Sequence, residues 1–216
     1  MTDRLRLFPL STVLFPGQAL PLVVFEQRYR LLVRECLDAG EPFGIVLIRE
    51  GVEVGGPAVP HAVGVTARIR DASRLPDGRL HIEVVGERRF RIVALFDDRP
   101  YLSAEVEYPV DDPGEPQPAQ LEEARERYRQ VVRLRDIVAG EFQRAIEVPA
   151  TPRGLADAVG GLGLASATER QRLLESMDGA RQLRVATELL GVTIEDMHAR
   201  AAEAVAARYG SASRLN

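Results

Sequence analysis

Histidine and cysteine, which bind transition metals most often, are rare in this chain, with three histidines and one cysteine. The histidines are His61, His81 and His198, and one of them falls in a metal-site spacing, Glu195-x-x-His198. Helical di-iron sites use that i, i+3 spacing, but they need two such motifs and two further carboxylates. One motif by itself indicates a solvated helix turn. We therefore predict no metal site.

The basic residues also limit the chemistry, because all 28 are arginine and none is lysine. Nucleotide-binding P-loops, Ser-Lys dyads and Schiff-base enzymes each depend on a lysine. The single cysteine, Cys36, excludes an internal disulfide and lies in an apolar helical stripe, where a thiol is inert. We predict no catalytic residue and no cofactor, and hence a binding module rather than an enzyme.

Arginines gather on one predicted face of neighbouring strands. Guanidinium groups on adjacent strands can bind phosphates or the carboxylates of a peptide. The interpretation we favour is a solvated face, neutralised by Glu83 and Glu87. The anion-binding candidates are Arg68, Arg70, Arg88, Arg89 and Arg91.

An apolar stretch near the N-terminus is the second candidate site. Pro9, Pro16 and Pro21 interrupt regular ladder pairing, which predicts an irregular rim. Exposed apolar groups beside unpaired strand edges suit an extended peptide, which binds by strand addition. The alternative, that some of these side chains belong to the core, stays open. The peptide-binding candidates are Phe8, Leu10, Leu14, Phe15, Pro16 and Pro21.

The elements that must position these groups change character at a proline-rich segment, residues 109–118. Apolar residues recur mostly with period two before it and mostly with period 3.6 after it. We predict an α+β protein, with a β domain over residues 1–110, a linker over 111–118, a helical bundle over 119–210 and a tail over 211–216.

Within the first part, the patterns predict a small, coiled, barrel-like sheet with one helix. Pro76-Asp77 is predicted as a two-residue hairpin loop, with Arg70 opposite Glu83 and Ile69 opposite Val84. The predicted strands span 19–25, 43–48, 63–70, 80–84, 89–92 and 102–108, and the helix spans 26–37.

Within the second part, capping patterns mark the helices. Thr151-Pro152 opens a short helix, and Ser166 with Glu169 forms a capping box. Before these, a longer helix is predicted over 120–142. After them we predict a helix over 180–190 and a separate final helix that begins at Thr193. Four or five helices at this spacing are typical of a small bundle.

Bulk composition is that of an ordinary globular protein of 216 residues, 45% hydrophobic, with a formal net charge of −4. No apolar stretch is long enough to cross a bilayer, and the N-terminus lacks the apolar region of a signal peptide. We therefore expect a cytoplasmic location. The acidic balance argues against binding of nucleic acid or an anionic membrane.

The N-terminal stretch also resembles a known family. Phe8-Pro9-Leu10, Val13-Leu14-Phe15-Pro16-Gly17, Pro21-Leu22 and Phe25-Glu26-x-Arg28-Tyr29 resemble the opening of the Lon protease N-terminal, substrate-binding domain. The similarity continues through Gly86-x-x-Arg89-Phe90-x-Ile92 and, more weakly, through the helical part.

This resemblance implies a PUA-like β pseudo-barrel followed by a helical bundle, and a role in engaging unfolded or tagged polypeptides. We expect a stand-alone, non-catalytic module without the ATPase and protease parts, which binds extended apolar segments as an adaptor in protein quality control. The alternative is RNA binding through the arginine face, as PUA-like folds often do. The oligomeric state stays open.

Overall fold

The computed structural model describes residues 4–110, 112, 114–140 and 145–209. The chain divides into two compact units. The strand-rich unit comprises Met1–Val110 and Ser166–Glu175, and the helical unit comprises Asp111–Ala165 and Ser176–Asn216. The predicted tail, linker positions 111 and 113, and the predicted helix end at 142 lie outside the described residues.

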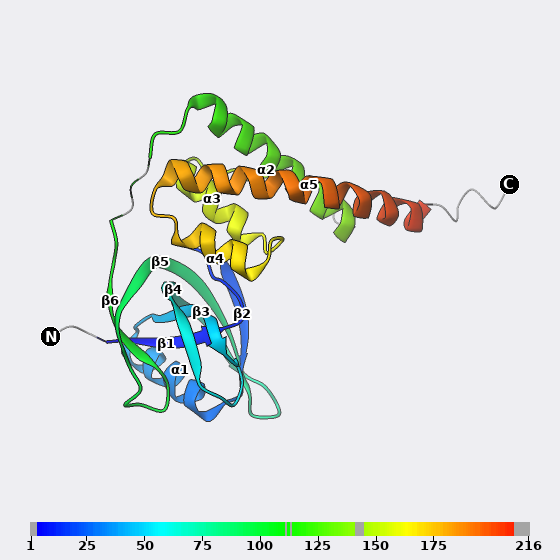
Figure 1. The fold of residues 1–216 in the computed structure, drawn as a ribbon. Helices are drawn as coiled ribbons and strands as arrows, with labels where there is room; N and C mark the ends of the chain where they lie inside the picture. Colours follow the sequence, from blue (N-terminus) through cyan, green and yellow to red (C-terminus); the bar gives the residue numbers. More distant parts are fainter. Residues whose placement is uncertain (1–3, 111, 113, 141–144, 210–216) are drawn as a thin grey trace. The chain divides into compact units, whose positions relative to one another are not determined.

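The strand-rich unit is built on one mixed sheet, which confirms the α+β class (Figure 1). The strand order is β2-β5-β4-β3-β1-β6, and β6 also pairs with β5. Strands β5, β4, β3, β1 and β6 therefore close a ring, and β2 joins it through β5 alone. The strands span Leu5–Leu10 (β1), Ala19–Val24 (β2), Phe43–Gly51 (β3), Ala58–Arg74 (β4), Leu80–Phe96 (β5) and Ser103–Glu107 (β6).

The hairpin of β4 and β5 follows the predicted alternation, with one correction. Ile69 lies opposite Val84 as predicted, but a bulge follows Ile69 and places Asp71, rather than Arg70, opposite Glu83. The loop is also longer than two residues. The Leu75 N–H donates to the Arg79 carbonyl at 2.8 Å, and the Gly78 N–H donates to the Leu75 carbonyl at 2.9 Å.

Helix α1 (Gln27–Ala39) packs its apolar stripe on the sheet, as the spacing of that stripe predicts. Tyr29, Leu32, Val33 and Cys36 are buried. The helix ends at Gly40, whose φ of 67° is left-handed and suits a residue without a Cβ.

The segment between β1 and β2 folds into the core of the strand-rich unit. Val13, Leu14 and Phe15 are buried there. The segment is fixed to the middle of β5, because the Gly17 N–H donates to the Gly86 carbonyl at 2.8 Å and the Gly86 N–H donates to the Gln18 carbonyl at 3.0 Å. Gly86 allows this approach, since a Cβ there would lie 2.2 Å from the Phe15 carbonyl oxygen.

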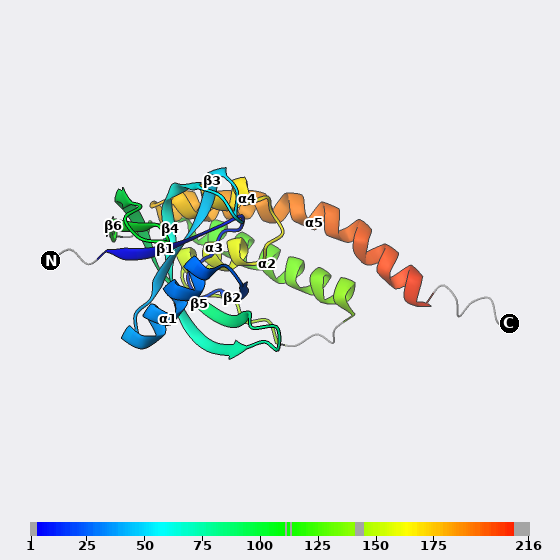
Figure 2. The same ribbon diagram turned by 90° about the horizontal axis from the view of Figure 1, so that it is seen from below.

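Helix α4 (Ala167–Glu175) belongs to the strand-rich unit, although its residues lie in the predicted helical bundle over 119–210. Its capping box is present, with the Ser166 N–H donating to Glu169 at 2.9 Å and the Glu169 N–H donating to the Ser166 hydroxyl at 3.3 Å. Within the strand-rich unit, α4 lies above the strands in Figure 1 and α1 lies below them, and Figure 2 shows the same unit from below.

The helical unit consists of α2 (Pro118–Ala139), α3 (Pro152–Gly161) and α5 (Gly179–Tyr209). Thr151 caps α3 as predicted, accepting from the Gly154 N–H at 3.0 Å. The predicted break before Thr193 is wrong, because α5 is continuous there. The Thr193 hydroxyl donates to the Leu189 carbonyl one turn back at 2.7 Å, so it does not serve as an N-cap.

Candidate functional site

The residues with potential catalytic chemistry lie apart. His61 Nδ1 lies 3.3 Å from a Glu175 oxygen, whereas His198 contacts Gln130 at 3.1 Å in the helical unit. Among the residues that the structure describes, no three His, Cys, Asp or Glu side chains are grouped as a metal site would require. Burial raises the pKa of the Cys36 thiol to about 11, which leaves it protonated and unreactive at neutral pH.

The five arginines of the predicted anion-binding face do not form one open cationic surface. Arg68 pairs with Glu87 at 2.5 Å, and Arg91 pairs with Glu107 at 3.5 Å. The Arg88 guanidinium lies 4.4 Å from the centre of the Tyr108 ring. Arg70 is exposed. The outer face is thus largely neutralised, although by Glu87 and Glu107 rather than Glu83.

The prediction that Arg89 points to solvent is wrong. Arg89 is buried, and its Nε donates to the Leu174 carbonyl of α4 at 3.1 Å. Its neighbour Phe90 is also buried, on the other face of β5. Both faces of the strand are therefore covered here, one by the sheet core and one by α4. The sequence alternation could not reveal this, because α4 lies some 80 positions further along the chain.

The apolar candidates separate into buried and exposed groups. Phe8, Leu10, Leu14 and Phe15 are all buried. Phe8 and Leu10 lie in the regular strand β1, which pairs in parallel with β3, so an irregular rim at these two positions is wrong. In this conformation the four side chains are core. Pro16 is half-buried and Pro21 is exposed.

The exposed part of the stretch continues along β2, where apolar side chains alternate toward solvent. Pro21 is exposed, Val23 is 44% exposed, and Phe25, just beyond the strand, is 48% exposed. They flank a cavity of about 150 Å³ whose floor includes Phe8 and Tyr29. We call this surface the β2 groove. It is lined by Phe8, Leu10, Pro21, Val23, Phe25, Tyr29 and Val54, together with Leu22, Val24, Glu26 and Glu53.

The floor of the β2 groove is rigidly packed. The Phe8 and Tyr29 rings stack with centroids 4.1 Å apart and planes 10° apart. Burial raises the pKa of the Tyr29 hydroxyl, so it remains a neutral hydrogen-bonding group. Such a floor provides a preformed apolar surface, which lowers the entropic cost of binding.

The carboxylates at the rim of the groove are engaged within the protein. Glu53 accepts from the Ser11 N–H at 2.8 Å and also from the Ser11 hydroxyl. Glu26 accepts from Arg28 at 3.0 Å and from the Gly55 N–H at 3.3 Å. These bonds hold the loop that carries Val54 against the groove, and they leave the groove apolar in character.

The groove suits strand addition. Within the described residues β2 pairs with β5 and with no other strand, so its second edge is unpaired. Pro21, which has no N–H, is tolerated at such an edge. An extended chain laid along β2 gains main-chain hydrogen bonds and places alternate side chains on the apolar surface. Val23 and Phe25 were not among the predicted contacts, although the period-two alternation of Pro21, Val23 and Phe25 in the sequence could have indicated them.

Comparison with known proteins assigns this fold to a family. The sequence model of the ATP-dependent protease La (LON) substrate-binding domain matches residues 4–191. The chain therefore belongs to the Lon substrate-binding domain family, which confirms the resemblance found from Phe8 to Tyr29.

Individual relatives agree with this assignment. The chain is 29% identical to a Lon protease of Methylocella silvestris over 187 residues, which is 85% of this chain and 23% of that protein. It is 28% identical to Lon protease 2 of Myxococcus xanthus, over 83% of this chain and 22% of that protein. The chain thus spans under a quarter of the length of these curated relatives.

Solved structures share the fold. A Lon N-terminal domain protein from Xanthomonas campestris matches with a TM-score of 0.62 and 30% identity, over 84% of this chain and 95% of that one. The N-terminal domain of Lon protease from the Mycobacterium avium complex matches with a TM-score of 0.66 and 21% identity, over 88% and 98%, which supports the fold alone. No helix in the described part of the chain is long and apolar enough to cross a membrane.

Proposed function

We propose that this protein is a non-catalytic substrate-recognition module that binds extended, apolar segments of unfolded polypeptides in the β2 groove. The observation that supports this most directly is the exposed apolar row of Pro21, Val23 and Phe25 on an unpaired strand edge. Membership of a substrate-binding domain family points to the same class of ligand.

The proposal assigns different roles to the sequence-predicted peptide contacts. Pro21 contacts the peptide directly. Phe8 and Leu10 form the floor beneath it, and Leu14 and Phe15 hold the corner that supports the groove. Because the relatives are named Lon proteases, we place the module in protein quality control in the cytoplasm, where it acts as an adaptor. We also propose that the ring of strands is a PUA-like pseudo-barrel and that the helical unit is a helical bundle.

A binding measurement with matched variants tests the groove. A fluorescein-labelled, unstructured apolar peptide is titrated with the protein, and fluorescence anisotropy gives the Kd. Val23→Asp should weaken binding about tenfold, because it places a charge against the bound apolar chain. The control is Val93→Asp, which changes an exposed valine of β5 outside the groove and should leave the Kd unchanged. Equal binding by both variants and the wild type would refute the groove.

The same titration addresses RNA binding through the arginine face. The ion pairs of Arg68 and Arg91 weaken that alternative, because paired guanidinium groups neutralise fewer phosphates. Binding of an RNA oligonucleotide that falls steeply with salt, without peptide binding, would replace our proposal with this alternative.

A further inference from the structure

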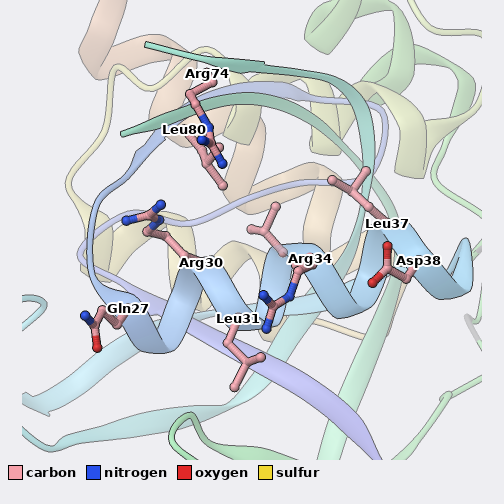
Figure 3. Close-up of a pocket in the computed structure, with 9 residues that line it drawn as sticks. Gln27, Arg30, Leu31, Arg34, Leu37, Asp38, Arg74 and Leu80 are labelled. Atoms are coloured by element: carbon pink, nitrogen blue, oxygen red, sulfur yellow. The ribbon is translucent and has the colours of Figure 1, made fainter. Parts of the chain in front are cut away.

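A second cavity of the strand-rich unit shares no lining residue with the β2 groove. It measures about 440 Å³ and opens between α1 and the end of the β4–β5 hairpin (Figure 3). Arg30 and Arg34 come from α1, and Arg74 comes from the last position of β4. We call it the arginine cavity, and define it by Arg30, Arg34, Arg74, Val33, Leu37 and Leu80.

The charges in this cavity are not balanced. Among the described residues, no carboxylate lies within ion-pair distance of Arg30, Arg34 or Arg74. This contrasts with the outer sheet face, where Arg68 and Arg91 both have carboxylate partners. The lining thus carries three guanidinium groups and one carboxylate, Asp38, and an external anion would meet a net positive charge.

The orientation of two of these side chains favours an anion between them. Arg30 rises from α1 toward the hairpin, and Arg74 descends from β4 toward the helix (Figure 3). Like charges that approach each other repel, and an anion held between them removes that repulsion and forms charge-assisted hydrogen bonds. Arg34 lies one helical turn after Arg30 and also lines the cavity, where it adds a third guanidinium group.

The remaining walls are apolar. Leu37 is 48% exposed although it lies in a concave site, and Leu80 lines the cavity beside Arg74. No aromatic residue lines it, so it has no platform on which a nucleic-acid base could stack. The ligand that fits therefore combines an anionic group with an aliphatic one.

One acidic residue, Asp38, lines the cavity and makes its two ends differ in charge. Asp38 lies four positions after Arg34 and eight after Arg30 on α1, roughly 6 Å and 12 Å further along the helix axis. It repels a second anion at that end and can accept a hydrogen bond from an N–H group. An acidic peptide segment offers this combination, with a carboxylate at one end and amide donors further along.

We propose that the arginine cavity binds a carboxylate carried by a polypeptide next to an aliphatic side chain, either an Asp or Glu side chain or the C-terminal carboxylate. This rests on the proposed function and specifies the chemistry of the segments that are recognised. Phe25, which lines the β2 groove, and Gln27, which lines the arginine cavity, lie two positions apart in the chain.

Four versions of one apolar peptide test the proposal and separate the two carboxylate sources. They carry Glu or Gln at one position, each with a C-terminal acid or amide. We expect at least one acidic version to bind the wild-type protein about tenfold more tightly than the Gln-amide version. That advantage should shrink when salt rises from roughly 0.1 M to roughly 1 M. Equal binding of all four versions would overturn the proposal that the arginine cavity binds a carboxylate.

Variants locate the effect. Arg30→Gln and Arg74→Gln should each remove most of the carboxylate advantage and leave binding of the Gln-amide peptide unchanged. Arg70→Gln is the matched control, because Arg70 is also an exposed arginine of β4 but lies outside the cavity. Thermal unfolding of each variant verifies that it is folded. If Arg74→Gln weakens acidic and neutral peptides alike, or if Arg70→Gln has the same effect, the assignment is wrong.

Two further outcomes separate this proposal from the proposed function. If the Gln-amide peptide does not bind but an acidic peptide does, the β2 groove fails and the arginine cavity stands. If inorganic phosphate or an RNA oligonucleotide displaces the acidic peptide at micromolar concentration, the cavity is a phosphate site and the carboxylate assignment is overturned.

Discussion

Two halves of one apolar segment have opposite fates in this protein. Val13, Leu14 and Phe15 are fully buried, whereas Pro21, Val23 and Phe25 reach solvent on β2. Both halves are rich in proline and large apolar side chains, so composition does not distinguish them. The difference arises from what covers each half.

The buried half is covered by a partner distant in sequence. Arg170 of α4 donates to the Val13 carbonyl at 2.6 Å and to the Thr12 hydroxyl at 3.2 Å, and its guanidinium lies 5.8 Å from the Phe15 ring centre. Among the described strands, nothing pairs with the outer edge of β2. The buried side chains of the first half therefore stabilise the fold. The exposed side chains of the second half are available to bind a ligand.

Replacing a phenylalanine in each half should give the largest contrast. Phe15→Asp buries an unpaired charge and should cost roughly 4 kcal/mol or more, enough to unfold many domains. Phe25→Asp should leave the fold intact, because that side chain is already half exposed. Far-UV circular dichroism and limited proteolysis of both variants measure the difference. Equal resistance of the two variants to proteolysis would contradict the division into a buried, stabilising half and an exposed, binding half.

Glycines on the two sides of the same corner provide the next test. Gly86→Ala places a Cβ 2.2 Å from the Phe15 carbonyl oxygen, a backbone atom that cannot move aside, and should cost about 2–3 kcal/mol. Gly17→Ala meets no atom within 4 Å but forces alanine into a φ of +77°, which costs about 1 kcal/mol. Urea unfolding should rank Gly86→Ala as the more destabilised variant. The reverse order would show that packing does not govern this corner.

The cover provided by α4 can be tested without touching the apolar segment. Arg170→Met keeps much of the side-chain volume but leaves the Val13 carbonyl without this donor, at a cost of about 2 kcal/mol. Burial lowers the pKa of Arg170, but its guanidinium stays charged at neutral pH. The control, Arg172→Met, alters an exposed arginine of the same helix and should change stability by under about 0.5 kcal/mol. Equal effects would show that α4 does not clamp the segment.

The sequence predicts most elements whose signals are local. The alternation of Val63, Val65 and Ala67 indicates β4, and the stripe of α1 with Gly40 after it indicates both the helix and its end. Strand β1 was missed because Pro9 argues against a strand. Its partner β3 begins more than 30 residues later, and a single-sequence pattern does not reveal such pairing.

The candidate site was harder to predict for the same reason. Which of Phe8, Phe15 and Phe25 reaches solvent depends on β3, α4 and the outer edge of β2. The arginine cavity shows the same limit. Arg30 and Arg74 are 44 positions apart, and only the folded hairpin brings them to one cavity. Local sequence patterns thus predict helices and strands. Which side chains are exposed, and which distant residues meet in one site, depends on tertiary contacts.

The smallest expected effect gives the finest test, because it uses one nearly isosteric substitution in both halves. Val13→Thr buries a hydroxyl where the side chain is 2% exposed and should cost about 1–2 kcal/mol. Val23→Thr keeps the β-branched shape at a position 44% exposed and should change stability by under about 0.5 kcal/mol. Peptide affinity should show the opposite pattern, with Val23→Thr weakening binding a few-fold and Val13→Thr leaving the folded protein's affinity unchanged. One result would contradict this division of roles. It is that one substitution changes both stability and peptide affinity while the other changes neither.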